Sequence, residues 1–179
     1  FETDVQLAVP IANEERRTQH LAVRLLFKLM MPEADLSQLV MADNGKPYLL
    51  GLPFHFSFSH CKGYAACAVD DKQPVGIDIE ICKEKTLKIA SRYMDITHLD
   101  NLTVADKIKK ATIIWGVKES IFKLKNEKGI SFPNHIFEAP FKMEDKKGTA
   151  QLIFNNNTED FQFQFEIIEE YAFVCALTK

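Results

Sequence analysis

The chain has 179 residues, of which 46% are hydrophobic and 26% are charged, a balance typical of a soluble globular protein. Its formal net charge of −3 excludes a generally basic surface, so we expect no nucleic-acid partner, and any anion site must be a local cluster of Lys and Arg. No apolar run approaches the roughly 18 residues of a membrane-spanning helix, and the first residues lack the pattern of a signal peptide, so we expect a cytoplasmic protein with no membrane partner.

The cysteines and histidines do not form a metal-binding pattern. The four cysteines, Cys61, Cys67, Cys82 and Cys175, lack CxxC spacing, and the five histidines lack HxxxH spacing. We interpret the cysteines as reduced thiols of the core.

The first predicted element is a helix that begins at Asn13 and ends before Pro32. Arg17, Arg24 and Lys28 are spaced by seven and four residues on this helix, so they share one face. Such a basic face is either solvated or a binding site for an anion, and the residues alone leave both interpretations open.

A turn and two strands are expected next. Lys46 and Pro47 end a predicted turn over residues 43–47, and an extended piece follows it. Residues 55–60 alternate polar and aromatic side chains, as in a strand with one buried face, and residues 64–69 form a second, apolar strand. Ser59 and His60 therefore lie at a strand end, where ligand contacts collect, although a histidine there is more often an ordinary surface residue.

A polar turn at residues 70–74 divides the chain into two expected halves, residues 1–73 and residues 74–179. The strand predicted at residues 75–81 has aliphatic side chains on one face and Asp78 and Glu80 on the other. Because neighbouring carboxylates repel each other, this face is either a solvent-facing edge or a site for a divalent cation.

Two helices are predicted in the second half, a short one at residues 86–93 and a long one at residues 104–125. At about 100° per residue, the long helix has an apolar stripe and an opposite arc of charged and aromatic residues. The stripe consists of Ile113, Val117, Ile121 and Leu124, and the arc of Trp115, Lys118, Glu119, Phe122 and Lys123. The arc is either a solvated surface or a functional site, and the acids at positions 78 and 80 favour a site.

Three strands are predicted to close the chain, at residues 150–154, 161–168 and 171–177. The last of them resembles residues 64–69, since both carry a tyrosine followed by cysteine, alanine and an aliphatic residue. We therefore predict an α+β fold of two similar halves related by a pseudo-twofold axis, each a small antiparallel sheet packed with a long helix.

Four short motifs, taken in chain order, resemble those of the 4'-phosphopantetheinyl transferase superfamily in its larger, two-halved form. They are GKPYL at 45–49, FSFSH at 56–60, VGIDIE at 75–80 and WGVKESIFK at 115–123. The resemblance implies a monomeric enzyme that transfers the 4'-phosphopantetheine group of coenzyme A to a serine of an apo acyl carrier or peptidyl carrier protein. Adenosine 3',5'-bisphosphate would be the second product.

The resemblance also assigns roles to residues in the second half. It makes Asp78, Glu80 and Glu119 the ligands of Mg²⁺, and their hard oxygen atoms suit that cation. It makes Glu119 the acceptor of the serine proton and Lys123 the contact to the pyrophosphate of coenzyme A. Lys118 is implied as a further coenzyme A contact with a less defined role, and Asp78 is counted among the contacts as well.

The 3'-phosphate and adenine end of coenzyme A is implied to bind in the first half. The residues that match the family there are Arg17, Arg24, Lys46, Pro47, Ser59 and His60. Basic side chains clustered on a phosphate make charge-assisted hydrogen bonds, which supplies the local positive charge that the net charge of the chain lacks.

One position departs from the family pattern. The family has a glutamate in the run that corresponds to residues 91–98, and here His98 stands in its place. This departure leaves open a catalytically degenerate protein that binds coenzyme A or a nucleotide without transferring a group. A third alternative is a structural domain whose acids only face solvent.

Overall fold

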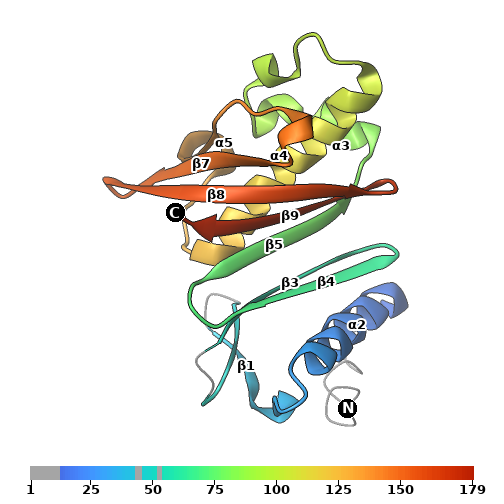
Figure 1. Ribbon diagram of the computed structural model, residues 1–179, viewed down its shortest axis with the longest axis vertical. Helices are drawn as coiled ribbons and strands as arrows, with labels where there is room; N and C mark the ends of the chain where they lie inside the picture. Colours follow the sequence, from blue (N-terminus) through green and yellow to red (C-terminus); the bar gives the residue numbers. More distant parts are fainter. Residues whose placement is uncertain (1–12, 43–45, 52–53) are drawn as a thin grey trace.

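The structure, a computed structural model, describes residues 13–42, 46–51 and 54–179 (Figure 1). Its first part begins with helix α2 (Glu14–Met30), capped by Asn13, whose side chain accepts a hydrogen bond from the Arg16 N–H at 2.9 Å. Two hairpins follow, β1 (Leu39–Met41) with β2 (Pro47–Leu49), and β3 (His55–Cys61) with β4 (Tyr64–Asp70). The predicted helix and the two predicted strands at residues 55–69 are confirmed, whereas residues 43–45 of the predicted turn lie outside the described residues.

Helix α2 packs on the β3–β4 hairpin through aromatic side chains. Phe27 is 1% exposed, and its ring centroid lies 4.9 Å from that of Phe56 and 5.6 Å from that of Phe58. Aromatic burial of this kind stabilises the contact by more than the apolar area alone would give.

The second part is a five-stranded antiparallel sheet of order β5-β9-β8-β7-β6, with helix α4 (Val104–Lys125) across one face (Figure 1). The strands are β5 (Val75–Ile81), β6 (Ile136–Glu138), β7 (Lys147–Phe154), β8 (Asn157–Ile168) and β9 (Tyr171–Thr178). The predicted apolar stripe of α4 faces this sheet, since Ile113, Val117 and Ile121 are fully buried. Among the described residues, six short helical pieces lie outside these elements: η1 (Leu36–Gln38), α3 (Glu84–Lys88), η2 (Ala90–Arg92), η3 (Ile96–Leu99), α5 (Phe132–His135) and η4 (Met143–Asp145).

The helix predicted at residues 86–93 is wrong in its extent, because the chain forms two pieces, α3 and η2, separated at Ile89. Tyr93, at the end of this segment, donates a hydrogen bond to the Ala111 carbonyl of α4 at 3.0 Å. This hydrogen bond joins residues that are far apart in the sequence and holds the segment against α4. The local sequence pattern therefore could not indicate it. The three-residue strand β6 was not predicted, because three residues are too short to display an alternating pattern.

Strand β3 joins the two parts by lying along the free edge of β5 (Figure 1). The backbone N–H groups of Ile77 and Ile79 donate to the hydroxyls of Ser57 and Ser59 at 3.0 and 3.1 Å. The residue numbers rise together from one pairing to the next, so the two strands run parallel here. Strand β5 is therefore interior to the molecule, and of the two interpretations left open for its acids, the solvent-facing edge is wrong for Asp78, which is only 7% exposed.

The class of fold is α+β, as predicted, with a long helix on an antiparallel sheet in each part. The pseudo-twofold relation and the division at residues 73 and 74 stay predictions, although β4 ends at Asp70 and β5 begins at Val75, on either side of the predicted turn. No helix among the described residues is long and apolar enough to cross a membrane.

Candidate functional site

A cavity of about 640 Å³ lies where α2 and β3 of the first part meet β5 and α4 of the second. We call it the central cavity. Its walls are formed by His20, Val23, Arg24, Pro47, Phe58, Ser59, His60, Asp78, Glu80, Trp115, Glu119 and Lys123. Most of the residues that the sequence motifs singled out therefore meet in one place, although they come from five different elements.

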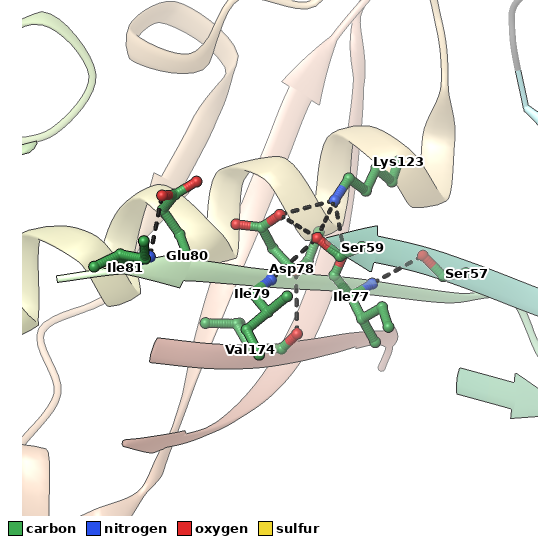
Figure 2. A network of polar contacts seen from close by, with 10 residues as sticks. Ser57, Ser59, Ile77, Asp78, Ile79, Glu80, Ile81, Lys123 and Val174 are labelled. Atoms are coloured by element: carbon green, nitrogen blue, oxygen red, sulfur yellow. Dashed lines mark hydrogen bonds and ion pairs between the residues drawn. The ribbon is translucent and has the colours of Figure 1, made fainter. Parts of the chain in front are cut away.

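Asp78 is the most deeply buried acid of the central cavity. It points from β5 toward α4, and its carboxylate accepts hydrogen bonds from the Ser59 hydroxyl at 2.9 Å and from Lys123 Nζ at 2.8 Å (Figure 2). Burial of an ionised carboxylate is costly unless it is paired and hydrogen-bonded, and Asp78 meets both conditions. One acid of β5 is thus held in place by residues of both parts of the chain.

Lys123 is the partner of Asp78, and it has a full set of acceptors. Its Nζ donates to Asp78, to the Ser59 hydroxyl at 3.1 Å and to the Ile77 carbonyl at 3.0 Å (Figure 2). An ammonium group has three N–H donors, so all of them are in use. Lys123 can contact a phosphate only if it gives up or shares one of these bonds.

Glu119 lies on α4 one turn before Lys123 and lines the same cavity. Its burial, reinforced by the negative charges of Asp78 and Glu80, raises the pKa of its carboxyl, against which Lys123 acts in the opposite direction. Glu80 accepts a hydrogen bond from the Ile81 N–H at 3.0 Å. The three acids that were predicted together from the sequence thus interact electrostatically across one cavity.

The three acids differ from a preformed site for a hard divalent cation in their spacing. In residues 13–42, 46–51 and 54–179, no three Asp, Glu, His or Cys side chains lie close enough together to surround one ion. The donor set nevertheless fits such a cation, because all three carboxylates line the same cavity and the negative charges of Asp78 and Glu80 contribute to the raised pKa of Glu119. Sharing one ion would require Asp78, Glu80 and Glu119 to move closer together.

Basic and polar side chains of the first part form another wall of the central cavity. Arg24 of α2 lines the cavity with Pro47, His60 and His20. Partial burial and the nearby charges of Lys123 and Arg16 lower the pKa of His60, which keeps its imidazole neutral near pH 7. This wall therefore offers hydrogen-bond donors and a guanidinium group to a ligand that reaches the acids from the other side.

Three residues predicted as coenzyme A contacts do not line the central cavity. Arg17 is exposed in the first turn of α2. Lys46 lies beside the cavity, where its Nζ donates to the Leu124 carbonyl near the end of α4 at 3.0 Å. Burial lowers the pKa of Lys46, with Lys125 contributing in the same direction.

Lys118 is the third, and the expectation that it shares the cavity-facing arc with Glu119 and Lys123 is wrong. Its side chain is 2% exposed and forms an ion pair with Glu138 of β6, where Nζ lies 2.6 Å from Oε2. The arc divides because α4 is covered on more than one side: Trp115, Glu119 and Lys123 line the cavity, while Phe122 packs near Phe132.

The cavity also contains residues to which the sequence analysis assigned no role. His20 and Val23 come from α2 and Phe58 from β3. A signal for His20 was present, because Arg16, His20 and Arg24 are spaced by four residues and so lie along one side of a helix. Arg16 shares this spacing, and its positive charge contributes to the lowered pKa of His60.

Comparison with known proteins adds an independent result. Residues 74–178 match the family model described as the 4'-phosphopantetheinyl transferase superfamily. A protein of Bacillus subtilis named 4'-phosphopantetheinyl transferase is 34% identical over 139 residues, which cover 75% of this chain and 60% of that protein.

Two further relatives carry similar names. The 4'-phosphopantetheinyl transferase Sfp of Bacillus subtilis (strain 168) is 40% identical over 51% of this chain and 42% of its own length. The 4'-phosphopantetheinyl transferase psf-1 of Bacillus pumilus is 37% identical over 61% of this chain and 47% of its own length. The chain thus spans 60% or less of these three curated relatives. Because the family model covers more than half of the sequence, the chain belongs to the 4'-phosphopantetheinyl transferase superfamily.

Proposed function

We propose that this chain transfers the 4'-phosphopantetheine group from coenzyme A to a serine of an apo acyl carrier or peptidyl carrier protein. The observation that carries the proposal is the central cavity, where Asp78, Glu80 and Glu119 face Arg24 and His60 across the boundary of the two parts. Membership of the superfamily and the names of the relatives support the same reaction.

Coenzyme A would lie across this boundary. Its 3'-phosphate and adenine would contact the basic wall, where Arg24 and His60 supply donors and Pro47 supplies an apolar surface. Lys46 and Arg17 would contribute only if they turned toward the ligand from their present positions beside the cavity. The pyrophosphate would lie near Lys123, which would exchange one of its three present acceptors for a phosphate oxygen.

Asp78, Glu80 and Glu119 would hold Mg²⁺, which when bound offsets the charge of the pyrophosphate and of the leaving phosphate. The serine hydroxyl of the carrier protein would attack the phosphorus that bears pantetheine. Glu119 would accept the serine proton, and the bond to adenosine 3',5'-bisphosphate would break. The burial that raises the pKa of Glu119 makes its ionised form a stronger proton acceptor.

Chromatography of the nucleotide products tests the proposal. Incubation with coenzyme A, Mg²⁺ and an apo carrier protein should release adenosine 3',5'-bisphosphate, and omission of the carrier protein should abolish the release. If none of a panel of acyl and peptidyl carrier proteins supports release, the proposed transfer is wrong.

The degenerate alternative rests on His98, which stands where the family has a glutamate. It predicts binding of coenzyme A without any transfer. Calorimetry that detects coenzyme A binding, together with no nucleotide release, would favour this alternative.

A further inference from the structure

A second group of charged side chains lies behind α4, outside the central cavity. Lys118 of α4 and Glu138 of β6 form an ion pair at 2.6 Å, and the two side chains are 2% and 3% exposed. Nδ1 of His98, from η3, lies 3.4 Å from the second oxygen of the same carboxylate, and its side chain is 12% exposed. Lys118 Nζ also donates to the Ile136 carbonyl. We call Lys118, Glu138 and His98 the rear cluster.

The rear cluster is an unusual place for charge. Burial lowers the pKa of Lys118, and the neighbouring Glu138 opposes that effect. A buried ion pair of this kind is seldom more stabilising than a pair of apolar side chains of similar volume. Global stability alone is therefore a poor explanation for the presence of these charges.

The position of the cluster on α4 offers a better explanation. Lys118 directly precedes Glu119, so the two side chains point about 100° apart around the helix axis. The ion pair to Glu138 fixes the rotation of this turn of α4, and Tyr93 fixes an earlier turn by its hydrogen bond to the Ala111 carbonyl. Because the back of the helix is tied to β6, the direction in which Glu119 enters the central cavity is set as well.

The same arrangement accounts for His98. The family pattern has a glutamate at this position, and here a carboxylate reaches Lys118 from Glu138 on β6, with His98 beside it. We propose that the rear cluster is a positioning device for Glu119, in which Glu138 replaces the motif glutamate and His98 orients the Glu138 carboxylate. This inference rests on the proposed function, and it assigns to Lys118 a positioning role in place of a contact to coenzyme A.

Steady-state kinetics of the Glu138→Gln variant test the inference. Loss of the charge should lower kcat about 10- to 100-fold, as removal of groups that orient a ligand of a metal does, and should leave KM for coenzyme A nearly unchanged. Glu166→Gln is the matched control, because Glu166 forms an exposed ion pair with Lys146 at 2.8 Å, and its kcat should equal that of the wild type.

Two double variants separate positioning from stability. Lys118→Met with Glu138→Leu replaces the pair by apolar side chains, and its thermal midpoint should be close to that of the wild type while kcat stays low. His98→Glu in the Glu138→Gln background returns a carboxylate to the motif position and should restore part of kcat. Wild-type kcat in the apolar double variant, or no recovery in the His98→Glu variant, would overturn the inference.

If the wild-type chain forms no product, the proposed function is wrong, and the positioning role of the rear cluster needs a separate measurement. Calorimetric titration of the wild type and of Glu138→Gln with Mg²⁺ provides it. Mg²⁺ binding weakened at least 10-fold in Glu138→Gln supports the positioning of Glu119. Equal Mg²⁺ affinity of the wild type and the variant, or no Mg²⁺ binding by either protein, overturns the inference.

Discussion

Ser59 is the residue in which the two parts of the chain meet most directly. Its hydroxyl donates to Asp78 and accepts hydrogen bonds from the Ile79 N–H and from Lys123. Ser57 has the same role toward Ile77 but makes no contact with Asp78. The two serines therefore share a structural function, and only Ser59 has a connection to the proposed chemistry.

Ser59→Ala and Ser57→Ala should each destabilise the protein by about 1 to 3 kcal/mol, because each leaves a buried N–H of β5 without an acceptor. Only Ser59→Ala should also lower the rate of transfer, since it removes a bond to Asp78 and a bond to Lys123. Chemical denaturation and initial rates measure the two effects. Equal rates in the two variants would show that Ser59 does not orient Asp78.

Asp78→Asn should lower kcat/KM by about 100-fold or more, because it removes one proposed metal ligand and the ion-pair partner of Lys123. Asp145→Asn, at the exposed end of η4 and outside the lining of the central cavity, is the matched control and should keep wild-type rates. Wild-type turnover by the Asp78 variant would refute the metal assignment.

At the scale of the elements, β5 and α4 pack so closely that a glycine is required between them. A Cβ atom at Gly76 would lie 2.0 Å from the Ser120 carbonyl oxygen, whereas one at Gly116 would lie 2.7 Å from a methyl group of Val174. A backbone oxygen of a helix cannot turn aside, but the end of a valine side chain can. The contact that brings Asp78 and Glu119 together thus depends on one small residue of the VGIDIE motif.

Gly76→Ala should therefore destabilise the protein by about 3 kcal/mol or more and Gly116→Ala by less, within the range of about 1 to 3 kcal/mol typical of overpacked cores. Thermal or urea unfolding of the two variants provides the comparison. A Gly76→Ala variant as stable as the wild type would contradict the packing described for β5 and α4.

The elements also show what sequence patterns can and cannot reveal. Strand β5 was predictable from its alternating aliphatic side chains and helix α4 from its stripe of Ile113, Val117, Ile121 and Leu124, whereas the grouping of the three acids in one site was implied by the family resemblance. The place of Lys118 was not predictable, because a helical wheel separates only two faces, whereas α4 is covered by the sheet, including its edge strand β6, and by α5 as well. Glu138 was missed for the related reason that β6 has only three residues and reaches Lys118 from 20 positions away.

At the scale of the whole molecule, the central cavity lies between the two parts, so a ligand that fills it should stabilise both together. Coenzyme A at 100 times its dissociation constant, with Mg²⁺, should add about 2.7 kcal/mol and raise the thermal midpoint by about 5 to 10 °C. Dephospho-coenzyme A, which lacks the 3'-phosphate, should give a smaller shift at the same concentration. Equal shifts with both ligands would place the 3'-phosphate outside the basic wall of Arg24 and His60.

The central claim is that the cavity holds a phosphopantetheinyl transfer site in which Glu119 takes part in the reaction. Intact-mass spectrometry of an apo carrier protein, incubated with coenzyme A, Mg²⁺ and either the wild-type chain or the Glu119→Gln variant, tests it most directly. The account predicts a gain of about 340 Da with the wild type, the mass of the transferred group, a loss of that gain with a chelator, and little or none with the variant. An unchanged carrier mass with the wild type, or the same gain at the same rate with the Glu119→Gln variant, would contradict it.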